Sequence, residues 1–317
     1  MAKALFTEPR FNDDAAAREH LEAIRWPSGP VCPHCGGTER NSRLNGAATR
    51  PGVIFCGDCR TQFTVTVGTV MERSKVPLHK WLLANHLICS AKKGISAHQV
   101  HRTIGVTYKT AWFMCHRIRE AMTETPSGMI GGGGKIVEAD ETYWGRREDA
   151  PPKPTTKKER FSYRGLRAMK DQRPIVALVE RDGSVRGFHM NAVTSANLAE
   201  VLRKHVNPKT HLMTDESKFY KVVGREFAKH STVNHGRKEY ARGNVSTNTI
   251  EGFFSVLKRG LVGTFHHVGD KHLQRYVNEF AFRYSNRTAV GVEDVERANK
   301  ALKGISGKRL TYKPVAA

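Results

Sequence analysis

Hydrophobic positions in residues 77–122 recur at the three- and four-residue spacing of α-helices. Within this segment, Ser96 and Thr107 each precede such a stretch, and Gly105 stands between them. Ser and Thr favour the position before a helix because their hydroxyls accept a backbone N–H, and Gly readily ends a helix in the left-handed conformation. The pattern therefore predicts a helix-turn-helix whose second helix spans residues 108–122.

Beyond residue 135, the pattern changes to short apolar runs that are typical of strands. These runs occupy residues 135–143, 174–180, 185–190 and 211–215. The Asp182-Gly183 pair between the second and third runs predicts a tight turn, and hence a β-hairpin. Helical patterns occupy residues 197–205 and begin again at residue 248. Strands and helices in this order predict an α/β domain built on a mixed sheet.

Four of the six cysteines form two close pairs, Cys32 with Cys35 and Cys56 with Cys59, and 20 residues separate the pairs. Two such pairs can supply four thiolates to one tetrahedral zinc ion, and four sulfur ligands leave no position for a substrate. Short β-like runs between and after the pairs complete the pattern of a zinc ribbon. The alternative is two unrelated redox or structural pairs, but the spacing favours one structural zinc ion per chain.

The charge balance points to a polyanionic partner. The chain has 52 Lys and Arg against 30 Asp and Glu, a formal net charge of +22. Such an excess repels itself unless an anionic polymer binds it, so we expect nucleic acid. No run approaches the roughly 20 apolar residues of a membrane span, and the N-terminus lacks the apolar core of a signal peptide. These features predict a cytoplasmic protein without membrane contact.

Basic side chains of the helix-turn-helix are candidates for DNA contacts. Lys109, Arg117 and Arg119 lie on its predicted second helix and could meet phosphates or base edges of double-stranded DNA. The alternative is an ordinary pair of helices with a solvated basic face. The segment 146–170, rich in Lys, Arg and Pro, predicts an extended loop that would suit an electrostatic arm along DNA.

Three carboxylates stand at positions that suit metal chemistry. Asp140 and Asp215 end predicted strands, and Glu251 lies in the first turn of a predicted helix. A buried Asp at a strand end is costly unless it is paired or holds a metal ion. Mg²⁺ prefers oxygen ligands, and phosphoryl transfer by two metal ions needs carboxylates of this kind. The residues therefore predict a phosphoryl-transfer site.

Several motifs in the same order resemble those of the fifteen-ninety-five family of bacterial insertion sequences. They are residues 138–143, 214–217, 234–235, 247–260 and 275–287, together with the N-terminal zinc ribbon. The resemblance covers roughly residues 15–300, and 35 residues separate Asp215 from Glu251. It implies a DDE transposase on an RNase H-like fold, with Asp140, Asp215 and Glu251 holding two Mg²⁺ or Mn²⁺ ions per site.

The resemblance leaves two choices for the third member of the triad. We predict Glu251, because a carboxylate is the stronger ligand for a hard cation, and Asn248, one helical turn earlier, is the alternative. Lys258 follows Glu251 by seven residues, where such enzymes often carry a basic residue. We expect Lys258 and Arg259 to contact DNA, although Lys258 could also merely offset Glu251 across the helix.

Other polar residues near these motifs receive weaker predictions. Glu138 shares a strand face with the first aspartate of the triad and is predicted to support the site. His235 could orient the site or a phosphate, although lone polar residues are more often simply hydrogen-bonded. Glu141, Glu216 and Asp270 are predicted to be solvated surface acids.

These predictions divide the chain into five segments. They are a zinc ribbon with its lead (1–70), a helical helix-turn-helix segment (71–127), a Gly-rich linker (128–134), a catalytic domain (135–305) and a basic tail (306–317). The predicted fold class is multidomain α/β, with an RNase H-like mixed sheet in the catalytic domain.

The predicted activity is a Mg²⁺-dependent DNA transposase that acts as a homo-oligomer on its element's terminal inverted repeats, in association with the bacterial nucleoid. It would nick DNA at the repeats and join the freed 3′-OH ends to target DNA. One alternative is a DNA-binding regulator, which would not need the three carboxylates. The other is an endonuclease of the same fold that cuts without joining.

Overall fold

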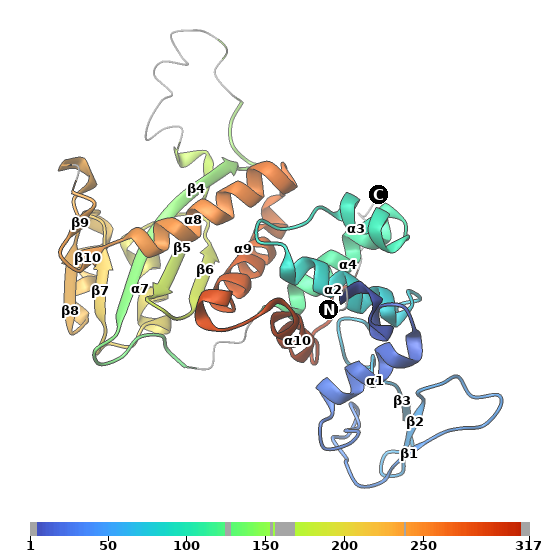
Figure 1. Cartoon of the computed structure of the whole chain (residues 1–317). Coiled ribbons are helices and arrows are strands. Elements are labelled where there is room, and N and C mark those ends of the chain that lie inside the picture. Colours follow the sequence, from blue (N-terminus) through green and yellow to red (C-terminus); the bar gives the residue numbers. More distant parts are fainter. Residues whose placement is uncertain (1–4, 124–127, 153–154, 156–168, 238, 312–317) are drawn as a thin grey trace. The chain divides into compact units, whose positions relative to one another are not determined.

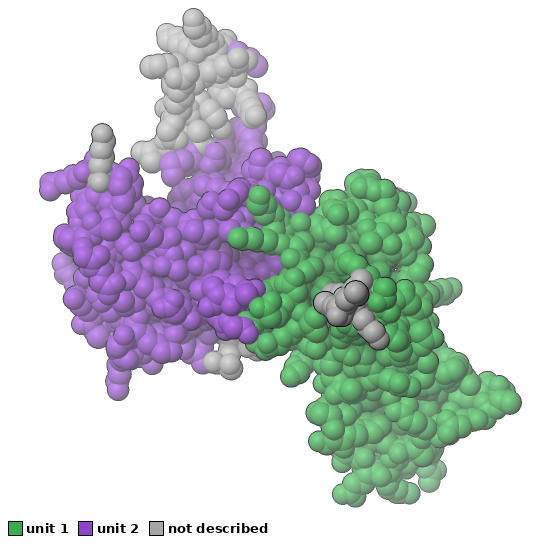
Figure 2. All heavy atoms as spheres, in the orientation of Figure 1, with its two compact units in different colours: residues 1–124, 292–317 green, residues 125–291 purple. Residues whose placement is uncertain are grey.

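The computed structural model describes residues 5–123, 128–152, 155, 169–237 and 239–311 (Figure 1). The chain divides into two compact units, which Figure 2 colours separately. Unit 1 contains residues 1–124 and 292–317, and unit 2 contains residues 125–291. Most of the predicted basic arm and residues 312–317 of the predicted tail lie outside the described residues. In the part of the chain that the structure describes, no helix is both long and apolar enough to cross a bilayer.

Unit 1 combines a small antiparallel sheet with a set of helices. Its strands are β1 (Asn41–Arg43), β2 (Ile54–Cys56) and β3 (Gln62–Phe63), in that order across the sheet. Its helices are α1 (Asp14–Arg25), α2 (Leu78–Ser90), α3 (Ala97–Ile104), α4 (Tyr108–Ala121) and α10 (Asp294–Lys303). Two 3₁₀ turns, Leu5–Thr7 and Pro9–Phe11, precede α1.

The predicted helix-turn-helix is formed by α3 and α4, and its capping residues are those that the sequence indicated. The Ser96 hydroxyl accepts the Gln99 amide at 3.1 Å at the start of α3. The Thr107 hydroxyl accepts the Thr110 amide at 3.3 Å at the start of α4. Gly105 between them has a φ of +63°, which a residue with a side chain seldom adopts.

The last helix, α10, belongs to unit 1, whereas the sequence predicted a second domain that continues to residue 305. The buried Asn85 side chain of α2 donates to the Ala298 carbonyl at 2.9 Å. The buried Arg297 of α10 donates to the Cys89 carbonyl at 3.2 Å. Buried polar groups need such partners, so these bonds fasten α10 to α2. The second unit therefore ends at residue 291 instead.

Unit 2 contains the mixed sheet, a small hairpin and its helices. The strands are β4 (Ile136–Arg146), β5 (Gln172–Glu180), β6 (Val185–His189), β7 (His211–Thr214), β8 (Lys229–Thr232), β9 (Ala241–Arg242) and β10 (Val245–Ser246). The helices are α7 (Ser195–His205), α8 (Asn248–Gly260), which continues into a π-helical turn (Leu261–Phe265), and α9 (Asp270–Ser285). Short 3₁₀ turns occupy Lys218–Tyr220, Val223–Glu226, His235–Arg237 and Thr288–Val290.

The sheet has the strand order β6-β5-β4-β7-β8. Strand β5 runs antiparallel to both β4 and β6, whereas β7 runs parallel to both β4 and β8. The predicted hairpin between β5 and β6 and the predicted mixed sheet are confirmed. Strand β8, at the edge, was not predicted because its residues, Lys-His-Ser-Thr, lack the apolar alternation of a strand.

The two faces of this sheet are each covered by an apolar cluster. On one face, α8 and α9 pack against alternate residues of β5, among them Ile175, Ala177 and Val179. On the other face, α7 packs against a cluster that includes Val137 and Ala139 of β4. Successive side chains of a strand point to opposite faces, so Glu138 and Asp140 lie on the face covered by α8. The sheet thus directs two acids of β4 towards one helix.

Part of the predicted Gly-rich linker (128–134) is held by hydrogen bonds to other residues of unit 2. The Gly131 amide donates to Glu180 Oε2 at 2.9 Å, and the Gly132 amide donates to Thr210 Oγ1 at 2.9 Å. Gly131 has a φ of +83°, and a Cβ there would lie 2.2 Å from Thr210 Oγ1. A side chain cannot fit at this position, so this glycine serves a close contact as well as a turn.

The close approach of α9 to β6 gives a test of this packing. A Cβ on Gly187 of β6 would lie 2.4 Å from Val277 Cγ1 of α9. We expect Gly187→Ala to lower the free energy of unfolding by about 1–3 kcal/mol, measured by urea denaturation, because the added carbon overpacks the core. The matched control is Gly252→Ala in α8, where a Cβ would meet nothing within 4 Å. Equal effects of the two substitutions would contradict this packing.

Candidate functional site

Both aspartates were predicted to end strands, but Asp140 lies in the interior of β4 (Ile136–Arg146), and only Asp215 directly follows its strand, the neighbouring parallel β7. Glu138 of β4 pairs in register with Met213 of β7. Asp140 lies two residues beyond Glu138, and Asp215 lies two residues beyond Met213, so the two aspartates continue the same register. Residues in register on parallel strands point to the same face of a sheet. Both carboxylates therefore lie on the side of the sheet that α8 covers.

Glu251 approaches the same place from the first turn of α8. Burial raises the pKa of Asp140 to about 8, and the negative charges of Glu141, Asp215 and Glu251 add to this effect. Burial also raises the pKa of Asp215. Neighbouring negative charges can raise the pKa of a buried carboxyl group in this way only where water screens them poorly. Asp140 thus lies in the negative field of Asp215 and Glu251, which favours a cation.

Glu141 also belongs to this field, although the sequence predicted a solvated surface acid. Its carboxylate is largely buried and accepts the Tyr220 hydroxyl at 2.7 Å. Burial raises the pKa of Glu141, and the bond from Tyr220 partly opposes that rise. Tyr220 is itself fully buried, in the 3₁₀ turn that follows Asp215. The contact ties the middle of β4 to that turn, and strand alternation alone gave no sign of it.

The other two predicted surface acids also have structural partners. Glu216 accepts the backbone amides of His235 and Gly236 at 2.9 and 3.0 Å, which holds the loop that carries His235. Asp270 begins α9 and pairs with the guanidinium of Arg173, whose side chain is 3% exposed. A buried guanidinium needs such a partner, so the prediction of a plain surface acid is wrong for Asp270.

His235 lies beside the predicted third carboxylate. Its Nε2 is 3.3 Å from Thr247 Oγ1 and 3.6 Å from Glu251 Oε1. The Thr247 hydroxyl in turn donates to Glu251 Oε1 at 2.9 Å. Asn248, the alternative third residue, is the first residue of α8 and is exposed. Thr247 is a site residue that the sequence did not indicate, and its position just before α8 was the available signal.

Further along α8, Lys258 and Arg259 are exposed. The Arg259 Nε donates to the Ser255 carbonyl of the same helix at 3.1 Å. Lys258 follows Glu251 by about two helical turns and therefore lies on the same side of the helix. The helix therefore carries positive charge about two turns beyond Glu251. Glu138, by contrast, is fully buried and turns its carboxylate to the start of α8.

The basic residues predicted for the second helix of the helix-turn-helix differ in exposure. Lys109 is exposed near the start of α4. The Arg117 guanidinium donates to the carbonyls of Leu310 and Glu72 and stacks on Phe113. Arg119 is only 2% exposed. The predicted DNA contact of Arg119 does not fit this burial, because the later turns of α4 pack into the core of unit 1.

The exposed polar surface of the helix-turn-helix lies elsewhere on α3 and α4. Arg102 and Gln99 of α3 are exposed, as is the beginning of α4. The Tyr108 ring stacks on His98 with 4.1 Å between ring centroids. The sequence gave a signal for the buried side, because Ala111, Cys115 and Arg119 recur every four residues. Such a stripe marks a single face of a helix.

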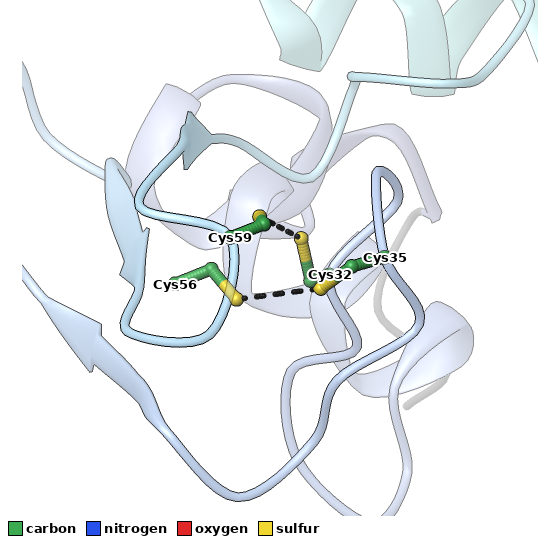
Figure 3. Close-up of side chains that lie close together, drawn as sticks. All are labelled: Cys32, Cys35, Cys56 and Cys59. Carbon is green, nitrogen blue, oxygen red and sulfur yellow. Dashed lines mark hydrogen bonds between the residues drawn. The ribbon is translucent and has the colours of Figure 1, made fainter.

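The four paired cysteines form a compact group around β2 (Figure 3). The Sγ atoms of Cys32 and Cys59 are 3.6 Å apart, as are those of Cys35 and Cys56. All four sulfurs lie within 4.8 Å of one another, and none is in a disulfide. Zn–S bonds of about 2.3 Å in a tetrahedron place sulfurs about 3.8 Å apart. The group therefore fits the four-thiolate zinc site that the spacing predicted.

Comparison with known proteins matches two parts of the chain to known domains. Residues 12–62 match the transposase zinc-ribbon domain, and residues 131–285 match the ISXO2-like transposase domain. The chain is also similar to an uncharacterized protein in transposable element ISH50 of Halobacterium salinarum. The two are 29% identical over 282 residues, which cover 86% of this chain and 91% of that protein.

The two domain matches together span more than half of the chain, and they occur in the order that the motifs predicted. The zinc-ribbon match contains all four clustered cysteines, and the transposase match contains Asp140, Asp215 and Glu251. The chain belongs to the fifteen-ninety-five (IS1595) family of insertion-sequence transposases.

Proposed function

We propose that this transposase binds the terminal inverted repeats of its element, nicks the DNA there and joins the freed ends to target DNA. The observation that carries the proposal is the shared negative field of Asp140, Asp215 and Glu251, which come from two adjacent strands and a helix. Such a field is costly to maintain without bound cations, and phosphoryl transfer commonly uses them.

The oxygen atoms of Asp140, Asp215 and Glu251 would hold two Mg²⁺ or Mn²⁺ ions, because these hard cations prefer carboxylate ligands. When bound, the ions supply activation of the attacking oxygen and stabilisation of the leaving one. The raised pKa of Asp140, caused by burial and by neighbouring negative charges, fits a site that a divalent cation would neutralise.

The reaction would proceed in two displacements at phosphorus. In the first, water attacks a phosphodiester at the element end, and the bond to the 3′ oxygen breaks to leave a 3′-OH. In the second, that 3′-OH attacks a target phosphodiester and displaces another 3′ oxygen. Lys258 and Arg259, exposed on the helix that carries Glu251, would bind phosphates of the DNA and hold them in place.

The helix-turn-helix is the proposed reader of the element end. Lys109 and Arg102 are exposed on α4 and α3, where side chains of this motif can reach a major groove. Because an element has two ends to be joined, we infer that the transposase acts on double-stranded DNA as a homo-oligomer.

A different class of function, a DNA-binding regulator without chemistry, would not need the carboxylates of unit 2. An endonuclease without joining activity remains a candidate, because the first displacement needs the same residues as the second. A strand-transfer assay with a pre-cut element end separates the two, since only a transposase inserts that end into target DNA.

For the zinc ribbon we propose one structural zinc ion per chain, held by Cys32, Cys35, Cys56 and Cys59. The strands around these cysteines are only two or three residues long. Elements this short bury little apolar surface, so metal binding would supply much of their folding free energy.

The first prediction about catalysis concerns the two aspartates. Asp140→Asn and Asp215→Asn each remove a negative charge while keeping the side-chain shape. We expect Mg²⁺-dependent cleavage to fall by two or more orders of magnitude, roughly the scale of removing a catalytic electrostatic interaction. Binding to element-end DNA, measured by gel shift, should remain within about twofold. Cleavage by either variant at near wild-type rates would rule out this site.

A second prediction separates Glu251 from Asn248. Because a carboxylate is the stronger ligand for a hard cation, Glu251→Gln should abolish cleavage, whereas Asn248→Ala should leave measurable activity. Both rates are measured on the same element-end duplex at saturating Mg²⁺. The opposite pattern, with Asn248→Ala inactive and Glu251→Gln active, would identify Asn248 as the third residue.

The zinc prediction uses metal analysis of the purified protein. We expect one zinc ion per chain, and Cys56→Ser should lose it because three thiolates close the site poorly. The variant should also expose residues 32–59 to limited proteolysis. The matched control is Cys89→Ser, a cysteine of α2 outside the cluster, which should keep the zinc. Metal-free wild-type protein that resists proteolysis over this range would contradict the proposal.

The last prediction of this subsection tests whether the exposed face of the helix-turn-helix, which carries Lys109 and Arg102, binds DNA. Replacing Lys109 and Arg102 by Ala should weaken binding to the inverted repeat by about 1–3 kcal/mol for each side chain that reads a base, with a smaller effect on random duplex. The control is Lys303→Ala, which removes an exposed charge from α10 in the same unit. An equally large effect of the control variant would show that only net charge matters.

A further inference from the structure

The start of α8 is capped in an unusual way. Thr247 stands at its N-cap position, where a threonine hydroxyl normally accepts a backbone N–H from the first turn. Here its side chain makes no cap bond and donates instead to Glu251 Oε1 at 2.9 Å. The first turn therefore needs another acceptor, because its backbone amides have no partner within the helix.

Glu138 of the central strand β4 supplies that acceptor. Its Oε2 accepts the Ile250 amide at 2.9 Å, and its Oε1 accepts the Thr249 hydroxyl at 3.0 Å. The carboxylate is fully buried. A negative charge at the start of a helix also interacts favourably with the helix dipole. A strand residue thus caps a helix more than 100 residues later in the chain.

Arg181, in the turn between β5 and β6, neutralises Glu138. Its Nε donates to Glu138 Oε1 at 2.7 Å. Its two terminal nitrogens donate to the side chains of Asn244 and Ser246 at 2.7 and 2.8 Å. A buried carboxylate without a partner would be costly, so Arg181 stabilises the charged cap and also orders the chain that enters α8.

We propose that Glu138 and Arg181 are positioning residues that set the place of Glu251 relative to Asp140. Glu138 and Asp140 lie on one face of one strand, two residues or about 6.6 Å apart. The cap joins Glu138 to the turn that carries Glu251, and it leaves the Thr247 hydroxyl available to orient the Glu251 carboxylate. This inference rests on the proposed function, because it assigns Glu251 a place in that site.

The test compares Glu138→Gln with Glu180→Gln in the full-length protein. A glutamine side chain has only one acceptor oxygen and no charge. Glu138→Gln therefore cannot accept from both the Ile250 amide and the Thr249 hydroxyl, and it leaves the Arg181 guanidinium without a negative partner. Glu180 is the control because it is also a glutamate of the sheet, at the end of β5. Its carboxylate contacts Lys135 and the Gly131 amide and makes no hydrogen bond or ion pair with α8 in the described part of the chain.

For Glu138→Gln we expect the Mg²⁺ concentration for half-maximal cleavage to rise by about 10-fold or more, as for other groups that orient metal ligands. In metal-free protein, hydrogen exchange of residues 247–254 should become faster. Element-end DNA binding should stay within about twofold, because none of the basic side chains proposed to bind DNA is changed. Glu180→Gln should change neither the Mg²⁺ requirement nor this exchange.

A second pair of variants keeps the test decisive if Glu138→Gln does not fold. Thr247→Val removes the hydroxyl that holds Glu251 and leaves the Glu138 cap in place, whereas Thr247→Ser keeps the hydroxyl. We expect the valine variant to need about 10-fold more Mg²⁺ and the serine variant to behave as wild type.

The outcomes also separate this inference from the proposed function. If Asp140→Asn and Glu251→Gln abolish cleavage while Glu138→Gln and Thr247→Val behave like Glu180→Gln, the positioning role is wrong and the proposed function stands. If Asp140→Asn cleaves like wild type, the proposed function itself fails.

Discussion

The parallel pairing of β4 with β7 places buried negative charge at one point in unit 2. Asp140 and Asp215 are distant in sequence, and the register of these two strands alone makes them neighbours. The rest of the unit offsets the cost of that arrangement. Glu141 is held by Tyr220, and His235 stands beside Glu251. Glu138, on the same face, is neutralised by Arg181. Each contact restricts the side-chain conformation of one acid near the site or partly neutralises its charge.

The cysteine group and the proposed carboxylate centre place opposite demands on the protein. The cysteine group is closed by its own four sulfurs and serves to stabilise a ribbon with little core. The proposed carboxylate centre must keep room for substrate oxygen atoms, so its acids cannot satisfy one another. Its cost is offset by the well-packed sheet beneath it, in which β5 is almost entirely buried. The stability of the packed sheet thus permits poorly compensated negative charge at the carboxylates.

Local signals in the sequence predicted much of this structure. The caps at Ser96 and Thr107 and the Asp-Gly turn before β6 depend on neighbouring residues, and the structure agrees with them. The cysteine pairs and the three carboxylates were found because their chemistry restricts residue type and spacing. Side-chain exposure was harder to predict. The sequence shows that Arg119 is basic, and its four-residue spacing from Cys115 and Ala111 was only an indirect sign of the burial that the packing shows.

Long-range contacts set the limit of prediction from sequence. No local pattern shows that Glu138 caps α8, because the bond joins a strand to a helix more than 100 residues away. The polar edge strand β8 forms because β7 offers it a partner, and its own residues give little preference for a strand. Tyr220 reaches Glu141 for a similar reason. These features depend on the completed sheet, so a one-dimensional pattern cannot reveal them.

The place of α10 has a consequence for how the chain is made. Unit 2 is inserted between α4 and α10, so the helical part of unit 1 lacks its last member until after unit 2 has been synthesised. A polypeptide that stopped at about residue 290 would contain every carboxylate of the candidate site, while Asn85 of α2 would lack its buried acceptor. Premature termination there would therefore remove a packing partner of the helix-turn-helix unit and leave unit 2 complete.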